Sequence, residues 1–308
     1  MHNPSVLALK EVRIPIIDGI SIVKSGDQIV PSQTSCNADW DQNLNHFASC
    51  FLTIQAEIPP LQITTFSVSY ISDGHAKIKF LAEGMFIEKN GIKATFMGYK
   101  DRANAQFTIQ VEQGDSKELL TFSTKYWSSY IDYFGTQQNS GDYIFRPMAN
   151  QFTPNVYSYL DYANLSEDTM SFYFAKNATA RYCGDERMIV HVSIDADLGV
   201  LRYMVDMDSI PGDKMDGYEV IVDFSVANFD NNQTFWTDSN GLEMQKRILN
   251  YRPTWDIQAN YNDSNENVTA NYYPINSAMS MRDVNSNRQF TVMNDRPQSG
   301  SALGKGAF

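Results

Sequence analysis

The sequence predicts an all-β protein, in which a large β-sandwich is preceded by a small β-portion. Three observations lead to this prediction. Alternating or β-branched runs recur along the chain, and turn-forming dipeptides separate them. No segment keeps the apolar i, i+3, i+4, i+7 spacing of an amphipathic helix beyond about two turns. Many short strands with regular turn signals are typical of a sandwich.

The strands are predicted in order from local patterns. Residues 12–23 carry β-branched residues on both sides of Asp18-Gly19, which predicts a β-hairpin. Residues 61–72 alternate with the period of a half-buried strand. Further strands are predicted at 76–82, 92–98, 106–112, 118–128, 140–146, 187–194, 199–206, 218–226, 271–275 and 289–293. Turns are predicted at Asp73-Gly74, Asn90-Gly91, Ser140-Gly141, Pro211-Gly212 and Asn240-Gly241.

Two segments depart from this pattern. Residues 35–50 are polar and predict a loop or one short helix. Residues 256–271 form an insertion rich in Asn, Asp, Ser and Glu. A soft boundary near residue 72 divides the chain into a small β-portion, residues 1–72, and a large sandwich domain, residues 73–308.

Composition excludes several classes of protein. The chain has 308 residues, 43% of them hydrophobic, which is the composition of a globular protein rather than a disordered one. Its formal net charge is −12 and its basic residues are scattered, which argues against nucleic acid and anionic membranes as partners. No apolar run is long enough to predict a membrane span.

Signals for cellular location are mixed. The N-terminus has no basic segment followed by an apolar stretch, so no signal peptide is predicted. Five Asn-x-Ser/Thr sequons nevertheless offer candidates for glycosylation, at Asn164, Asn177, Asn232, Asn262 and Asn267. The combination predicts a secretory-pathway protein whose front end is missing from this sequence.

Cysteine and histidine usage argues against a metal site within the chain. The three cysteines are Cys36, Cys50 and Cys183, and no Cys-x-x-Cys occurs. A bond between Cys36 and Cys50 would close a loop of about 15 residues, worth about 3 kcal/mol in the chain-entropy model, and would leave Cys183 over. The sequence does not fix this pairing. The four histidines are widely spaced, so no metal ligand set is predicted.

The run from Phe235 to Trp255 combines a turn signal with several charged and aromatic residues. Asn240 followed by Glu243 resembles a helix capping box, but Gly241 and the Arg252-Pro253 pair favour a hairpin turn that leads into a strand. Asp238 and Glu243 could serve as the carboxylate pair of a glycosidase. The alternative is a turn-forming aspartate and a surface glutamate, and the sequence favours this second interpretation.

Several blocks of the sequence resemble the C-terminal part of glycoside hydrolase family 38, the lysosomal-type α-mannosidases. The strongest block reads Phe-Trp-Thr-Asp-Ser-Asn-Gly-Leu-Glu at 235–243 and continues to Tyr-Arg-Pro-Thr-Trp at 251–255. Other blocks follow in the family's order, and they lie at 3–4, 12–15, 87–96, 126–127, 140–147, 271–276, 289–296 and 298–306. The resemblance thus covers nearly the whole chain, and it implies a supersandwich like that of galactose mutarotase.

The resemblance also implies which parts of an α-mannosidase this sequence does not supply. Members of the family hydrolyse terminal α-D-mannose residues of glycoprotein glycans, with one zinc ion held by a His-x-Asp pair, a nucleophilic aspartate and a later histidine. No histidine of this chain is followed two residues on by aspartate, and no acid/base residue can be assigned. We therefore expect no catalytic residue and no metal here, zinc only in a full-length parent enzyme, and no turnover by this chain alone.

Further expectations follow from the same resemblance. The chain is expected to be cut at its C-terminal end, to support a separate catalytic domain, and to be lysosomal or secreted. Partners would be mannose-containing glycans reached through that catalytic domain, and a homo-oligomer is compatible with the family. Tyr143, in the Ser-Gly-x-Tyr block, is the one candidate for contact with substrate, against the alternative of a half-buried strand tyrosine. A structural role is expected for Asp238, Gly241, Glu243, Arg247, Arg252 and Trp255.

Two other function classes are consistent with the residues. A stand-alone carbohydrate-binding or adhesion module would use Tyr126, Trp127, Tyr130 and Tyr133 as a platform for stacking on sugars. A self-contained hydrolase would use Asp238 and Glu243, or another carboxylate pair, without metal.

Overall fold

The computed structural model describes residues 9–16, 20–36, 40–41, 46–47, 50–60, 63–72, 79–101, 105–129, 140, 145–147, 159–165, 169–175, 188–195, 197–207, 217–254 and 266–308. Its described elements are antiparallel strands and one helical turn, α2 (Glu266–Thr269), which confirms the predicted all-β sandwich class.

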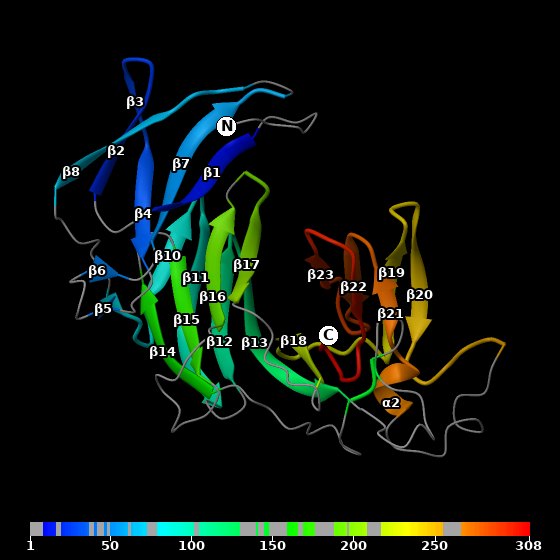
Figure 1. Cartoon of the computed structure of the whole chain (residues 1–308). Coiled ribbons are helices and arrows are strands. Elements are labelled where there is room, and N and C mark those ends of the chain that lie inside the picture. Colours follow the sequence, from blue (N-terminus) through cyan, green and yellow to red (C-terminus); the bar gives the residue numbers. More distant parts are fainter. Residues whose placement is uncertain are drawn as a thin grey trace.

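Two five-stranded sheets form the centre of the molecule (Figure 1). The first sheet contains, in spatial order, β10 (Phe86–Lys89), β11 (Ile92–Asp101), β12 (Gln106–Gln113), β13 (Ser116–Ser129) and β18 (Gly217–Val226). The second contains β17 (Val200–Met207), β16 (Met188–Asp195), β15 (Thr169–Ala175), β14 (Tyr159–Leu165) and β9 (Lys79–Phe80).

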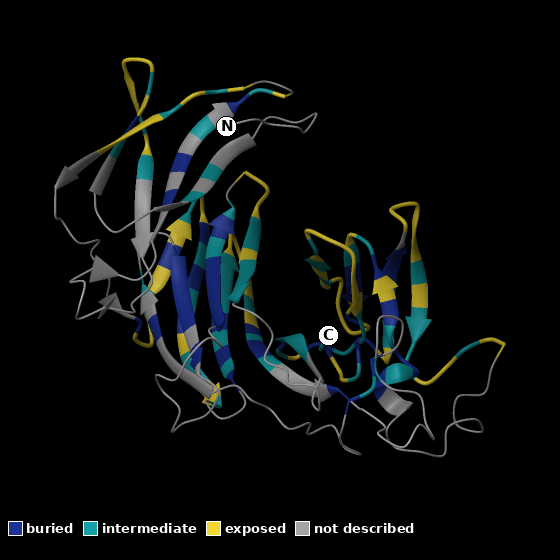
Figure 2. Ribbon diagram, in the orientation of Figure 1, coloured by how far each residue is buried: buried dark blue, intermediate teal, exposed yellow. Residues whose placement is uncertain are grey.

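The alternating sequence pattern of these strands produces the core between the two sheets. Phe96 on β11 and Phe107 on β12 point inward, and both contact Phe172 of the opposite sheet. The rings of Phe107 and Phe172 stack with centroids 3.7 Å apart. Figure 2 shows β16 as almost wholly buried, which fits its near-continuous apolar sequence. A layer of aromatic side chains therefore fills the space between the two sheets, and the burial of its apolar surface stabilises the sandwich.

A third, four-stranded sheet lies beside this sandwich, with the order β20 (Glu243–Ile248), β19 (Thr234–Ser239), β22 (Ala278–Arg282), β23 (Gln289–Met293). A two-stranded pair, β21 (Tyr273–Ile275) and β24 (Gln298–Gly300), accompanies it. Phe235, Met279 and Met281 of the third sheet belong to the same buried cluster as the sandwich core. The last residues of the chain pair with β18, since Phe224 and Phe308 exchange backbone hydrogen bonds.

The N-terminal strands form separate small sheets, drawn above the sandwich in Figure 1. One contains β1 (Leu9–Ile16), β7 (Cys50–Ile58) and β4 (Ser32–Cys36), and another contains β3 (Gln28–Val30), β2 (Ile20–Ser25) and β8 (Ser67–Ser72). Cys36 and Cys50 are register partners on β4 and β7. The division after residue 72 remains a prediction.

The predicted hairpin at Asp18-Gly19 is wrong. The strands on either side, β1 and β2, lie in different sheets, because β1 pairs with β7 and β2 pairs with β3 and β8. The hairpin of this region turns instead at Gly26-Asp27, where Ser25 pairs with Gln28 and Gly26 has φ +60°. Pairing with strands far along the chain therefore outweighed the local turn signal.

The segment 35–50 also differs from the expectation of a loop or one short helix. Its described residues include two short paired strands, β5 (Trp40–Asp41) and β6 (His46–Phe47). The strand predicted at 140–146 falls largely outside the described residues. In the neighbouring described part, Pro147 makes an isolated bridge to Ser129 at the end of β13.

Candidate functional site

The block around Asp238 forms a β-hairpin, as predicted. Strands β19 and β20 pair in antiparallel register, with Ser239 opposite Glu243. Asn240 and Gly241 at the turn have φ of 52° and 70°. Asn and Gly adopt this left-handed conformation more easily than other residues, so the Asn-Gly dipeptide accounts for the reversal.

The Asp238 carboxylate is surrounded by hydrogen-bond donors. Its Oδ1 accepts the backbone N–H groups of Asn276, Ser277 and Ala278 at 2.7, 3.0 and 3.2 Å. Its Oδ2 accepts the N–H of Gly241 and the hydroxyl of Ser277, both at 3.1 Å. The side chain is buried. Because its donors come both from the hairpin turn and from residues 276–278, the carboxylate holds the turn against the segment that enters β22.

The pKa of Asp238 reflects these contacts. Burial acts to raise the pKa of this carboxyl, but the backbone N–H groups of Ser277, Ala278, Gly241 and Asn276 outweigh it and hold the pKa well below its usual range. A carboxylate with its lone pairs engaged in this way is a poor nucleophile and a poor proton donor. The geometry argues against Asp238 as a glycosidase residue.

Glu243 lies on the solvent side of the same hairpin. It is exposed, it begins β20, and its carboxylate accepts a hydrogen bond from the side chain of Gln245. The neighbouring Leu242 at the hairpin tip is 86% exposed. A retaining or inverting glycosidase needs two carboxyl groups on either side of the scissile bond. The pair hypothesised from the sequence instead combines an engaged carboxylate with an exposed one.

Arg247 and Arg252 pack against one aromatic ring. Their guanidinium carbons lie 4.5 and 4.7 Å from the centre of the Tyr273 ring, which is buried. Arg247 Nε donates to the Thr237 hydroxyl at 3.1 Å, and Arg252 donates to the carbonyl of Ala270 at 2.9 Å. These contacts join β19, β20 and the segment around β21, and they are cation–π and hydrogen-bonding contacts of a fold interior.

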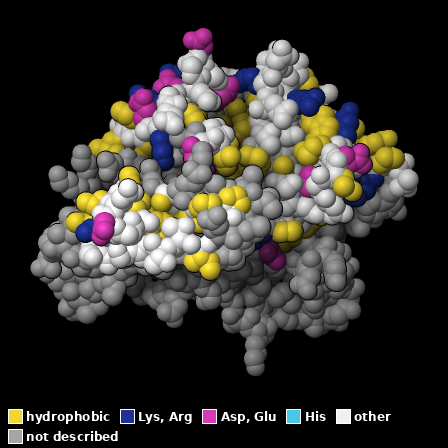
Figure 3. Space-filling view, turned by 90° about the horizontal axis from the view of Figure 1, so that it is seen from above, with side chains coloured by type: hydrophobic (Ala, Val, Ile, Leu, Met, Phe, Trp, Pro, Cys, Tyr) yellow, Lys and Arg dark blue, Asp and Glu magenta, His cyan; other side chains and the backbone are white. Residues whose placement is uncertain are grey.

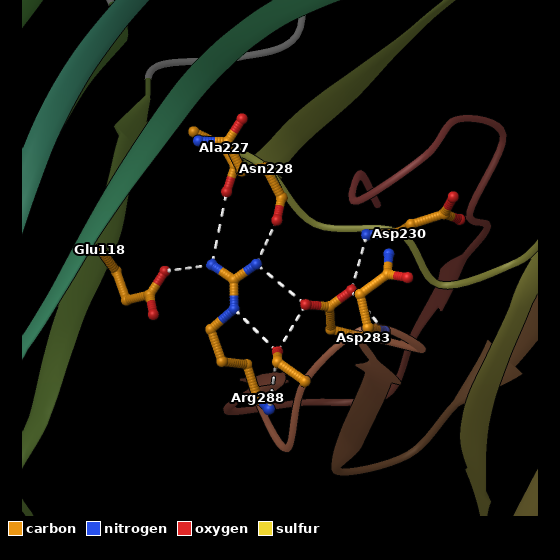
Figure 4. Close-up of polar contacts among 8 residues, drawn as sticks. Glu118, Ala227, Asn228, Asp230, Asp283 and Arg288 are labelled. Carbon is orange, nitrogen blue, oxygen red and sulfur yellow. Dashed lines mark hydrogen bonds and ion pairs between the residues drawn. The ribbon is translucent and has the colours of Figure 1, made fainter.

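A second polar cluster was not anticipated from the sequence. Arg288, just before β23, donates to Glu118 of β13 at 3.0 Å and to Asp283 at 2.9 Å, and it also contacts the carbonyls of Ala227 and Asn228 (Figure 4). The pKa of Asp283 is held well below its usual range by hydrogen bonds from Ser286, the backbone of Asp230 and Arg288. This cluster connects the third sheet to the central sandwich. No local spacing signals the whole cluster, because Glu118 and residues 227–230 lie far from Arg288 in the sequence.

The structure describes only some of the other residues that the sequence offered as candidates for a functional or modification site. Tyr143, Trp255, Asn177, Asn262, Tyr130, Tyr133 and Cys183 lie outside the described residues. Tyr126 and Trp127 are on β13, where they pair with Val220 and Glu219 of β18. Asn164 is on β14 and Asn267 is in α2. Asn232 lies on an exposed turn before β19.

The described side chains do not fit a metal centre. No three His, Cys, Asp or Glu side chains come together among them. His191 on β16 is buried and its Nδ1 lies 2.8 Å from the Ser171 hydroxyl. The donor set for the zinc ion that the resemblance implies is therefore not found in the described part of the chain. The helix that the structure describes is too short and polar to cross a membrane.

Charged side chains of both signs are dispersed over the described part of the face in Figure 3. On the described part of the face in Figure 3, Lys and Arg side chains alternate with Asp and Glu and with hydrophobic groups. Among the described residues, several charges are paired, as in Lys117–Glu112 at 3.1 Å and Lys305–Asp230 at 2.8 Å. This distribution does not resemble the continuous basic surface of a nucleic-acid-binding protein.

Comparison with known proteins identifies the family. Residues 133–307 match the model of the Glycosyl hydrolases family 38 C-terminal domain. The chain belongs to glycoside hydrolase family 38. The matched region includes the Asp238 hairpin, the Tyr273 contacts and Arg288 with its partner Asp283, whereas Glu118 of the Arg288 cluster lies before it.

Full-length relatives within family 38 are similar over almost the whole chain. Lysosomal alpha-mannosidase of Bos taurus is 30% identical over 306 residues, which cover 96% of this chain and 27% of the relative. The Mus musculus protein of the same name is 28% identical, over 100% of this chain and 29% of its own length. The Homo sapiens protein is 27% identical, over 96% and 28% respectively. The chain thus spans less than a third of the length of these relatives.

Proposed function

We propose that this chain is the C-terminal β-region of an α-mannosidase-type glycoside hydrolase, in which it supports the catalytic region. The activity of the whole enzyme would be hydrolysis of terminal α-D-mannose residues of glycoprotein glycans. The match of residues 133–307 to the family 38 C-terminal domain carries this proposal. The names of the similar proteins, lysosomal alpha-mannosidases, supply the substrate class.

The geometry of the strongest sequence block supports a structural role. Asp238 accepts five hydrogen bonds from its own hairpin and from residues 276–278. Arg247 and Arg252 are engaged with the buried Tyr273. Side chains held this firmly serve rigidity rather than proton transfer, so a structural role is proposed for Asp238, Arg247 and Arg252. The same role is proposed for Gly241 at the turn, for the exposed Glu243 at the start of β20 and for Trp255, which lies outside the described residues.

The chemistry would then reside elsewhere in the enzyme. The zinc ion and the catalytic carboxylates belong, in this proposal, to parts of the enzyme other than these 308 residues. Tyr143 remains the one residue proposed to reach the sugar. Because the relatives are named as lysosomal, this protein is proposed to be lysosomal or secreted.

An activity assay of the purified 308-residue chain tests the proposal. A chromogenic α-mannoside is supplied at mildly acidic pH, with and without added zinc, and a full-length family 38 enzyme serves as the positive control. We expect no turnover above the uncatalysed rate in either condition. Zinc-dependent turnover would mean that the chain contains a complete active site.

A binding assay separates this proposal from a stand-alone carbohydrate-binding module. The same preparation is screened against immobilised mannose-containing glycans, because a module of that class binds sugars without hydrolysing them. We expect no retention by the isolated chain. Specific retention that is lost when Tyr126 and Trp127 are replaced by alanine would favour the binding module.

A further inference from the structure

We propose that Asn232 carries an N-linked glycan. Asn232-Gln233-Thr234 is one of the five sequons, and it is the one whose asparagine side chain the structure describes. The inference rests on the proposed passage of the protein through the secretory pathway, because the transferring enzyme acts there.

The sequon forms a tight, exposed turn. The backbone N–H of Thr234 donates to the carbonyl of Asn231 at 2.9 Å. The two central residues, Asn232 and Gln233, have φ of 46° and 58°, which are the positive values of a type I′ turn. Both residues are exposed. The asparagine therefore stands at the corner of a turn, where an attached sugar extends into solvent.

The turn does not depend on the Asn232 amide. Its neighbour Asn231 is buried and uses its side chain instead, donating to the carbonyl of Thr234 at 3.0 Å and accepting the N–H of Gly306 at 3.1 Å. Asn232 contributes its backbone N–H, which donates to Asp230 at 2.9 Å. Among the described residues, the hydrogen bonds that shape this turn do not involve the side-chain amide of Asn232.

The sequon at Asn164 offers a contrast. Asn164 lies within β14 and pairs with Ser171 on one side and Phe80 on the other. The backbone at Asn164 is thus paired within a sheet, whereas the backbone at Asn232 turns at the surface. We therefore expect occupancy at Asn232 and none at Asn164.

The modification transfers an oligosaccharide from a lipid-linked pyrophosphate donor. A bond forms between Asn232 Nδ2 and C1 of the first sugar, and the bond from C1 to the pyrophosphate oxygen breaks. The lipid pyrophosphate leaves, and the amide nitrogen gives up one proton. The hydroxyl of Thr234 completes the acceptor motif, and in the folded protein it donates to the Asn232 carbonyl at 3.3 Å.

Mass spectrometry of the protein from a glycosylating eukaryotic secretory host tests the inference. After trypsin and peptide N-glycosidase treatment in heavy-oxygen water, the peptide 215–246 contains Asn232 as its single sequon. We expect residue 232 to be read as heavy-oxygen aspartate. If residue 232 remains asparagine while another sequon carries a glycan, this inference is overturned but the proposed secretory location is not. Absence of glycan from every sequon overturns it together with the proposed secretory location.

Two matched variants at Thr234 make the assignment specific. Thr234→Ser keeps the hydroxyl that the acceptor motif needs, whereas Thr234→Val has a similar shape without it. We expect Thr234→Ser to retain the glycan on peptide 215–246 and Thr234→Val to lose it. A glycan that persists in the valine variant would show that the modification is not attached through this sequon.

Discussion

The Asp238 carboxylate accepts the backbone N–H of Asn276 at 2.7 Å, although 38 positions separate the two residues in the sequence. The same carboxylate also holds Gly241 in the turn of its own hairpin. One side chain therefore fixes both the shape of the β19–β20 hairpin and its position against β22. The block that most clearly marks the family is thus used by the fold itself.

Gly306 is predicted to be intolerant of a side chain. It has φ of +59°, and an added Cβ would lie 2.7 Å from the carbonyl oxygen of Phe229. Because the obstacle is backbone, it cannot move aside cheaply. We expect Gly306→Ala to lower the free energy of unfolding by about 3 kcal/mol in urea titrations followed by tryptophan fluorescence.

Gly114 provides the matched control for that experiment. It has a similar φ of +57°, but no atom lies within 4 Å of an added Cβ. Gly114→Ala should therefore cost only the backbone strain, about 1 kcal/mol. Equal losses in the two variants would show that the close approach of Gly306 to Phe229 contributes nothing to stability.

Tyr203 is predicted to stabilise the contact between the two central sheets through its hydroxyl. The hydroxyl is hydrogen-bonded to that of Thr124 on β13, and the ring stacks on Phe122 at 5.3 Å. Burial raises the pKa of Tyr203 above its usual value, so the group stays neutral. We expect Tyr203→Phe to lower the free energy of unfolding by about 1–2 kcal/mol, because the buried Thr124 hydroxyl loses its partner.

The exposed Tyr251 serves as the control for Tyr203 in the same denaturation assay. Its side chain is 54% exposed, so Tyr251→Phe should leave the unfolding midpoint unchanged. A Tyr203→Phe variant as stable as the parent protein would contradict a contribution from the Tyr203–Thr124 hydrogen bond.

Stability is predicted to fall in acid. The pKa values of Asp238 and Asp283 are lower in the folded protein than the usual value of about 3.9 expected in the unfolded chain. The contribution of these two carboxylates to the free energy of unfolding is therefore complete above about pH 4, and it is lost as the pH falls towards their pKa values in the folded protein. Urea midpoints measured between neutral and strongly acidic pH should be level at first and then decline. A midpoint that rises on acidification would contradict the hydrogen-bonded geometry of these carboxylates.

Local signals allowed part of the fold to be predicted. Asn90-Gly91 forms the expected turn between β10 and β11, since both residues have positive φ and Lys89 pairs with Ile92. The strand expected at 289–293 coincides with β23. These elements follow from turn chemistry and alternation, which involve neighbouring residues only.

Long-range contacts explain what sequence reasoning missed. Asp18-Gly19 carries a hairpin signal, yet the flanking strands pair with 50–58 and 67–72 instead. Arg288 was not singled out, because its partner Glu118 lies 170 positions away. Asp238 was recognised as a turn residue, but its bonds to residues 276–278 depend on the third sheet and have no counterpart in the local pattern.

The most direct test of the structural role of this block compares Asp238→Asn with Glu243→Gln by urea denaturation. Both variants remove one negative charge and keep the size of the side chain. The account predicts that Asp238→Asn lowers the free energy of unfolding by about 3 kcal/mol, because several buried N–H donors lose a charged acceptor, while Glu243→Gln leaves it unchanged. An Asp238→Asn variant as stable as the Glu243→Gln variant would contradict the account.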